Sequence, residues 1–226
     1  MNQILERLTD VILMIPILLI ALPFHEYAHA FVAYKMGDPT AKDAGRLTLN
    51  PLKHLDILGT LMMLVARVGW AKPVPVNSGY FKDRRKGMIL VALAGPISNL
   101  LLAFVFMFIW GAMIKLVVVE IIPVRSETMV TVISWLQVFF QVSVLVNISL
   151  AVFNMIPVPP LDGSRLISSF IPEESYYRFA RYEQFIGLGF LALVIFAPNA
   201  LSSVIHFVAD PIYNSMVTAI SFIFGL

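Results

Sequence analysis

The sequence predicts an all-α, polytopic membrane protein, and its composition and its apolar runs support this fold class. Hydrophobic residues make up 59% of the 226-residue chain, the mean hydropathy is +0.84 and only 13% of the residues are charged. Soluble domains are less apolar, and several of the apolar runs are long enough to cross a bilayer as helices. A net charge of +2 is too small to suggest a nucleic-acid partner. We therefore expect the lipid bilayer as the surroundings and no nucleic acid.

The first predicted helix runs from about Asp10 to Met36 and ends at Gly37-Asp38-Pro39, where glycine and proline stop a helix. Its apolar run from Val11 to Leu22 has the length of a signal-peptide core. The start is not clearly cationic, however, and no small-x-small cleavage site is present, so we expect a retained span. Pro23 could kink this helix or sit in a lipid-facing bend.

The segment from Thr40 to Lys86 consists of short apolar pieces broken by Gly, Pro, Asn and charge. Alternation over Arg46 to Leu49 predicts a strand. Leu55 to Val68 is about 14 residues long, short of the roughly 20 that a crossing helix needs, which favours a re-entrant or interfacial piece. Prolines make Lys72 to Asn77 extended. It could pair with a substrate backbone by strand addition or serve as a rigid connector, and both interpretations stay open.

Two further full spans follow this segment. One runs from about Gly87 to Val118 and carries Asn99, for which helix-to-helix hydrogen bonding is favoured over catalysis. The other runs from about Thr131 to Met155 and leads into the proline-rich stretch Pro157 to Gly163. A membrane tolerates such irregular backbone only where it is buried in protein or lines a polar cavity.

The rest of the chain is predicted to form a connector followed by two hydrophobic stretches. The connector is amphipathic and rich in four charged residues, Glu173, Glu174, Arg178 and Arg181. The stretches cover about Gln184 to Ala197 and Leu201 to Leu226, interrupted by Pro198-Asn199 and by Asp210-Pro211, and their number of crossings stays open. We divide the chain into a core at residues 1–165 and a C-terminal connector with transmembrane helices at residues 166–226.

Charge predicts the orientation of the spans. Between Lys35 and Lys86 there are ten lysines and arginines against four aspartates, and positive loops stay in the cytoplasm. The loop after the second span holds only Glu120, Arg125 and Glu127 as charged residues. The first and third spans would then both enter from the outside, which brings their polar ends together in the cytoplasmic half of the membrane.

The motif His25-Glu26-x-x-His29 lies directly after the apolar run of the first span. Histidines four residues apart share one helix face, where two imidazoles can hold one zinc ion. Glu26 can reach a water on that metal. Ionisable groups at membrane depth are costly and usually functional. Because the sequence has no cysteine, any ligands must be nitrogen or oxygen.

Hydrolysis at zinc needs a third protein ligand and an activated water. Asp162 in the proline-rich stretch is a strong candidate, although Asp-Gly is also a frequent turn pair. Glu26 would take a proton from the water and pass it to the leaving amine. Asn154 is placed to donate a hydrogen bond to the oxyanion.

The remaining two histidines have less specific interpretations. His54, two residues before Asp56, could support a metal ligand, but a loop histidine bonded to backbone is favoured. His206 is interpreted as lying at the membrane interface.

Together these motifs resemble those of the site-2 proteases, which are intramembrane zinc metalloproteases, and specifically their compact bacterial members. The resemblance covers Phe24 to about Arg165. It rests on seven motifs, His25 to His29, Gly37 to Ala41, Gly45 to Pro51, His54 to Asp56, Gly69 to Asn77, Ala94 to Asn99 and Asn154 to Gly163.

The resemblance implies a three-helix catalytic core, with a small re-entrant or β-like segment between its first two helices and further helices after it. It implies one zinc ion bound by His25, His29 and Asp162. Glu26 would be the catalytic acid and base, and Asn154 would contact the substrate or its oxyanion.

The family cuts peptide bonds within or near the transmembrane segments of other membrane proteins, often to release a signalling fragment. Many members carry a PDZ domain or a CBS pair, and we expect neither here because no loop is long enough. We expect a multi-pass protein of the bacterial inner (plasma) membrane. Its partners would be the bilayer and a transmembrane protein substrate, and its oligomeric state stays open.

Three alternatives stand beside a protease of this kind. An ion or solute transporter can also use intramembrane histidine, aspartate and broken helices, but no inverted repeat is evident. A catalytically silent relative could bind membrane partners, although His25, Glu26, His29 and Asp162 are all present. A zinc metalloprotease of another family would typically take a glutamate as third ligand, and no glutamate fits as well as Asp162.

Overall fold

The computed structural model describes residues 2–56, 59, 71–171 and 173–226. Its elements are almost entirely helical, and the chain order is α1 (Asn2–Lys35), α2 (Thr40–Asp43), η1 (Pro51–Lys53), η2 (Ser78–Tyr80), α4 (Arg84–Val118), α5 (Glu127–Asn154), α6 (Asp162–Ser168), α7 (Glu173–Phe196) and α8 (Pro198–Phe224). No strand occurs among these residues.

Within the described residues, four helices are long and apolar enough to cross a membrane: Ile12–Lys35, Arg84–Val118, Glu127–Asn154 and Pro198–Phe224. The prediction of an all-α polytopic membrane protein is therefore confirmed. Side-chain caps set the starts of two of them. Asp83 accepts a hydrogen bond from the Lys86 amide at the start of α4, and Ser126 accepts one from the Met129 amide at the start of α5.

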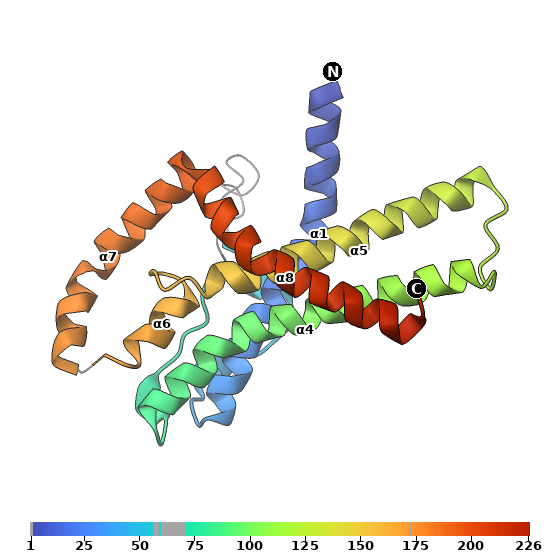
Figure 1. Cartoon of the computed structure of the whole chain (residues 1–226). Helices are drawn as coiled ribbons and strands as arrows, with labels where there is room; N and C mark the ends of the chain where they lie inside the picture. The colour runs from blue at the N-terminus through green and yellow to red at the C-terminus, as the bar shows by residue number, and fades with distance from the viewer. Residues whose placement is uncertain (1, 57–58, 60–70, 172) are drawn as a thin grey trace.

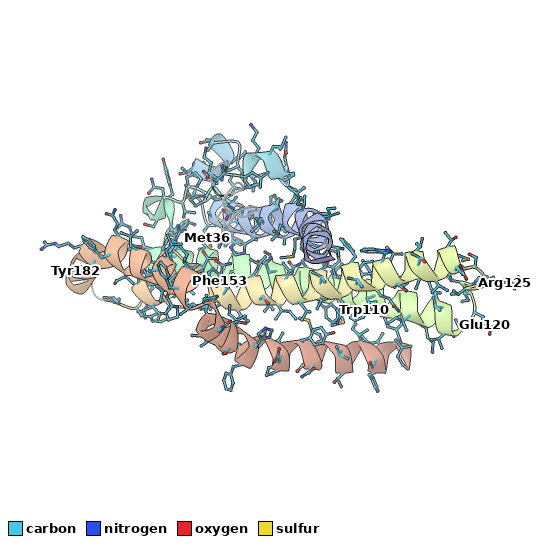
Figure 2. All side chains as sticks on the ribbon, turned by 90° about the horizontal axis from the view of Figure 1, so that it is seen from above. Met36, Trp110, Glu120, Arg125, Phe153 and Tyr182 are labelled. Carbon is cyan, nitrogen blue, oxygen red and sulfur yellow. The ribbon has the colours of Figure 1, made fainter. Side chains whose placement is uncertain are left out.

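The long helices pack around a central pair formed by α4 and α5, which run side by side in opposite directions (Figure 1). Seen from above, α1 lies on one side of this pair and α8 on the other (Figure 2). The largest apolar core joins α4, α5 and α8 through seven buried residues, Ala103, Phe106, Met107, Val144, Ile148, Ala209 and Ile220. A Cβ at Gly111 would lie 2.4 Å from Ile220 Cγ2, so this glycine lets α8 approach α4 closely.

Pro23 lies inside α1 and its side chain is fully buried. The alternative of a lipid-facing bend at this proline is therefore wrong. The helix continues to Lys35 and stops at Gly37, whose φ of +106° suits glycine far better than other residues.

The predicted strand over Arg46 to Leu49 is wrong. This segment forms bends after Gly45, and the one pairing found between described residues nearby is an isolated antiparallel bridge between Leu55 and Ala71. Alternation predicted a strand, but the buried Arg46 guanidinium donates to the carbonyl oxygens of Lys72 and Pro73 and so replaces a backbone ladder. The interpretation of Leu55 to Val68 as re-entrant or interfacial falls mostly on residues outside the described part of the chain.

The C-terminal region is more continuously helical than the sequence suggested. The predicted connector and the first hydrophobic stretch form one helix, α7, and α8 begins directly at Pro198. Asp210-Pro211 does not interrupt α8, in which the Ser215 hydroxyl donates to the Pro211 carbonyl oxygen. The division of the chain at residue 165 stays a prediction.

Candidate metal centre

His25 and His29 project from one face of α1, as the spacing predicts for a helix. Both are buried, their rings meet edge to face with centroids 4.6 Å apart, and their Nε2 atoms are 3.0 Å apart. The chain therefore holds two imidazole nitrogens close together in a buried position.

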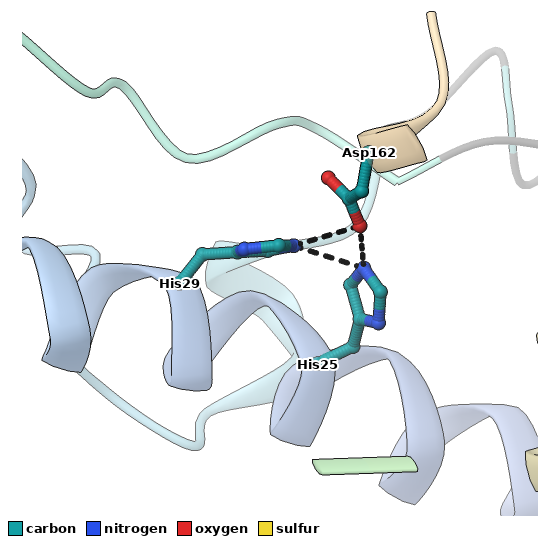
Figure 3. Close-up of side chains that lie close together, drawn as sticks. All are labelled: His25, His29 and Asp162. Carbon is teal, nitrogen blue, oxygen red and sulfur yellow. Dashed lines mark hydrogen bonds and ion pairs between the residues drawn. The ribbon is translucent and has the colours of Figure 1, made fainter. Parts of the chain in front are cut away.

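Asp162 is brought to the same point from 133 residues further along the chain. It opens α6, and its Oδ2 lies 3.1 Å from the Nε2 of each histidine (Figure 3). The three candidate ligand atoms lie within 4.8 Å of one another, and all three residues are buried. We call His25, His29 and Asp162 the donor triad.

The turn that delivers Asp162 depends on a glycine. A Cβ at Gly163 would lie 2.3 Å from the Met155 carbonyl oxygen, so only glycine fits where the chain folds back over the end of α5. Burial alone would raise the pKa of the Asp162 carboxyl, but its contacts with His25 and His29 outweigh burial and hold that pKa below its ordinary value.

Three residues of α4, each four positions apart, meet the histidine pair. The Val91 carbonyl oxygen accepts a hydrogen bond from His29 Nδ1 at 2.7 Å, and Asn99 Oδ1 accepts one from His25 Nδ1 at 2.6 Å. Between them lies Gly95, where a Cβ would be 2.4 Å from His29 Nε2 and 2.5 Å from His25 Cε1. The packing of α4 against the triad therefore requires glycine.

A chain of buried side chains fixes which way Asn99 points. Asn147 Nδ2 donates to the Ser143 carbonyl oxygen at 2.8 Å, and that oxygen can only accept. The Asn147 Oδ1 therefore faces Asn99 and accepts from its Nδ2 at 3.0 Å. This leaves Asn99 Oδ1 as the acceptor for His25. The interpretation of Asn99 as a helix-to-helix hydrogen bonder fits, and the residue also orients a member of the triad.

The donor triad fits a divalent cation. Each histidine donates from Nδ1 to an oxygen, so Nε2 is the nitrogen left to bind a metal, and both Nε2 atoms converge on the Asp162 carboxylate. Ligands about 2.0–2.1 Å from a tetrahedral zinc are roughly 3.3 Å apart, close to the spacing seen.

Glu26 lies beside the pair on α1 and is half-buried. Its Oε2 accepts a hydrogen bond of 3.0 Å from the Val74 amide, which belongs to the extended segment Lys72 to Asn77. The far end of that segment is held by Asp38, whose Oδ2 accepts from the Asn77 amide at 2.7 Å. Together with Arg46, these side chains fix the segment along its length.

Asn154 closes α5, and the structure does not join it to the triad. Its Nδ2 donates to the Leu150 carbonyl oxygen at 2.9 Å within its own helix. Its predicted contact with an oxyanion stays a prediction. His54 is fully buried and bonds through Nε2 to the Thr48 carbonyl oxygen at 2.7 Å, which agrees with the favoured backbone-bonded interpretation.

Sequence reasoning did not connect Val91, Gly95, Asn99 and Asn147 to the histidines. Asn99 was interpreted only as a helix-to-helix hydrogen bonder, Gly95 was only part of the motif Ala94 to Asn99, and Asn147 had no assigned role. The four-residue spacing of Val91, Gly95 and Asn99 was the available signal, because it places them on one face of a helix.

Comparison with known proteins gives a consistent result. The model of peptidase family M50 matches residues 13–197. YwhC of Bacillus subtilis is 42% identical over 178 residues, which cover 79% of this chain and 78% of YwhC. Rip2 of Mycolicibacterium smegmatis is 30% identical over 187 residues, 78% of this chain and 63% of Rip2. MJ0611 of Methanocaldococcus jannaschii is 34% identical over 146 residues, 64% of this chain and 63% of MJ0611.

All three relatives are provisionally named zinc metalloproteases. No solved structure matches the chain.

Proposed function

This chain belongs to peptidase family M50 and is a zinc metalloprotease, and from that premise we propose that it hydrolyses peptide bonds within or near the transmembrane segments of other membrane proteins. One observation carries the proposal. The donor triad is buried between α1 and α4, two helices able to cross a membrane, so a peptide bond must reach it at membrane depth. Membership of this family argues against two of the alternative interpretations, a transporter and a metalloprotease of another family.

We assign zinc to His25, His29 and Asp162, because these residues offer three converging nitrogen and oxygen atoms. When bound, zinc supplies Lewis-acid activation of a water and of the substrate carbonyl. The hydrogen bonds to Asn99 and to the Val91 carbonyl oxygen keep both histidines in the form that leaves Nε2 free to bind metal.

Glu26 is the proposed acid and base. It follows His25 directly on α1, so its carboxylate can take a proton from the attacking water and give it to the leaving nitrogen. The Val74 amide holds that carboxylate in place. Asn154 is the proposed donor to the oxyanion, a role for which its side chain must first leave the Leu150 carbonyl oxygen.

The segment Lys72 to Asn77 is proposed to hold the substrate. A peptide bond in a transmembrane helix has its carbonyl engaged in the helix ladder, so the substrate must unwind before hydrolysis. Arg46, Glu26 and Asp38 fix the segment in an open, non-helical course beside the site. These clamps suit both strand addition to the substrate and a rigid connector, and only strand addition would bring the segment into contact with the substrate backbone.

The bacterial inner (plasma) membrane is the proposed location. The excess of lysine and arginine between residues 35 and 86 supports a cytoplasmic position for the loop that carries the segment.

The deciding experiment compares wild type with Glu26→Gln and Asp162→Ala on a tagged transmembrane substrate, with bound zinc measured in each purified protein. We expect cleavage to fall by about 100- to 10,000-fold in Glu26→Gln, with zinc retained. Asp162→Ala should lose both cleavage and zinc. Glu120→Gln, an equal change of charge in the exposed loop after α4, is the control and should cut normally.

If both variants cut as well as wild type, the protease assignment is wrong. If only Glu26→Gln is silent, Asp162 is misassigned as a ligand. A wild-type protein that holds zinc and cuts no transmembrane substrate would support a catalytically silent relative.

A further inference from the structure

One side of α8 carries a continuous row of polar residues. Each follows the previous one by three or four positions, so they share a helix side, and all are exposed. We call these six residues the polar stripe: Asn199, Ser203, His206, Asp210, Asn214 and Thr218.

The polar stripe lies away from the surface that packs α8 onto the protein. Ile205, Ala209 and Ile220 point from α8 into the core shared with α4 and α5. Figure 2 shows α8 on the opposite side of the α4 and α5 pair from α1, the helix that carries His25 and His29.

The polar groups of the stripe are only partly satisfied within the described chain. The Ser203 and Thr218 hydroxyls each donate to the carbonyl oxygen four residues earlier, at 2.9 Å. His206 Nδ1 lies 3.2 Å from Asp210 Oδ1, and both side chains are 62% exposed. The side-chain amides of Asn199 and Asn214 make no hydrogen bond with any described residue.

A bilayer makes this arrangement costly. Unpaired amides and carboxylates in hydrocarbon lose their hydrogen bonds to water, so polar residues in spans normally face protein or a water-filled cavity. A helix lying flat on a membrane would escape this cost, but such helices are typically rich in lysine and arginine on their polar face. α8 contains neither, and it is apolar and long enough to cross.

We propose that a second copy of this chain covers the polar stripe, with α8 packed against α8. Two copies inserted the same way are related by an axis along the membrane normal, which brings equal residues to equal depth. A side-chain amide both donates and accepts, so Asn199 and Asn214 can each pair with their own counterpart. This self-complementarity favours a second copy over a partner of different sequence.

The centre of the stripe is also suited to self-association. His206 and Asp210 lie one turn apart. An imidazole ring has two nitrogens and a carboxylate has two oxygens, so each His206 and Asp210 can contact both its neighbour on α8 and the same pair in the other copy. Ser203 is small and lets the two backbones approach. This inference does not depend on the proposed proteolysis.

Crosslinking tests the contact directly, because the sequence has no cysteine and one introduced thiol is unique. Ser203→Cys should form a disulfide-linked dimer when the protein is oxidised in lipid vesicles at low protein density. Ser134→Cys on α5 is a matched control, since Ser134 is also exposed and also donates to the carbonyl four residues earlier, at 2.8 Å. Equal crosslinking of both variants indicates random collision and overturns the proposal.

Dilution into lipid tests the energetic role of the stripe. Energy transfer between labelled copies measures the dissociation constant of the dimer. We expect this constant to be about tenfold higher in the double variant that combines His206→Leu and Asp210→Leu. Phe207→Leu, an apolar change beside the stripe, should leave it within about twofold. Retained zinc confirms that each variant is folded.

A wild-type protein that is monomeric at every lipid ratio overturns the proposal, as does a dimer that the double variant leaves unchanged. In cell membranes, a Ser203→Cys crosslink to a different protein, with none to a second copy, also overturns it and assigns the surface to that partner.

Discussion

The molecule contains two sets of polar side chains in helices able to cross a membrane, and they differ in how they are satisfied. Around the donor triad, Asn99 and Asn147 are fully buried and each makes hydrogen bonds at both ends of its amide. Along the polar stripe of α8, Asn214 is exposed and its amide is unpaired among the described residues. The comparison indicates that the first set is complete within one chain, whereas the second needs something from outside.

The largest effect is expected where the triad is packed most tightly. Gly95→Ala places a methyl group 2.4 Å from His29 Nε2, so α4 must move and the triad must open. We expect the purified protein to hold less than about a tenth of the wild-type zinc and to lose cleavage, because metal sites tolerate only small displacements of their ligands. Zinc can be measured by elemental analysis.

Gly189→Ala is the matched control, because a Cβ at Gly189 meets nothing within 4 Å. Normal zinc content in Gly95→Ala would show that the packing around the triad is looser than described.

A smaller effect is expected from the residue that orients His25. Asn99→Leu removes the acceptor for His25 Nδ1, so the ring can turn or change its protonated nitrogen. Loss of such a partner typically weakens metal binding by about 10- to 100-fold. Competition with a chelator measures this change. Asn214→Leu, the same replacement on the polar stripe, should leave the zinc affinity unchanged. An equal loss of zinc affinity in both variants would contradict the difference between the polar residues around the donor triad and those of the polar stripe.

The smallest effect concerns stability. Asn147→Leu removes the nearer acceptor of the buried Asn99 Nδ2 and leaves it only the Ala21 carbonyl oxygen at 3.5 Å, which should lower the free energy of unfolding by about 1–3 kcal/mol. Asn214→Leu removes no hydrogen bond in a single chain and should change that free energy by less than about 0.5 kcal/mol in the monomer. Unfolding in bicelles at high dilution compares the two. A larger loss in Asn214→Leu would mean that the stripe is already paired within one copy.

The spans could be predicted from the sequence because membrane crossing depends on length and hydrophobicity, both of which are local properties. The start of α4 is only three residues from its predicted position at Gly87. The strand over Arg46 to Leu49 was mispredicted because alternation shows that one face is apolar but not whether a ladder partner exists. Here the Arg46 side chain takes the place of that partner.

The residues of the candidate site were also predictable only in part from the sequence. His25 and His29 could be paired from spacing alone, since a helix places residues four apart on one face. Asp162 could be singled out as a candidate from the irregular proline-rich stretch, but its assignment as the third ligand depended on the family resemblance, because helix spacing does not fix its position relative to α1. The roles of Asn99 and Gly95 depend on how α4 is rotated and shifted against α1. This relative placement of the two helices cannot be predicted from a single sequence.

The distance along the chain between the donors has a consequence for synthesis. On the proposed assignment, the ribosome must add 133 residues after His29, the last of which is Asp162, before all three ligands are present. Until then the nascent protein carries two ligands without the third, and it can cut neither its neighbours nor itself. The nascent protein is therefore inactive during translation because Asp162 comes late in the sequence, and no separate inhibitor is needed to keep it inactive.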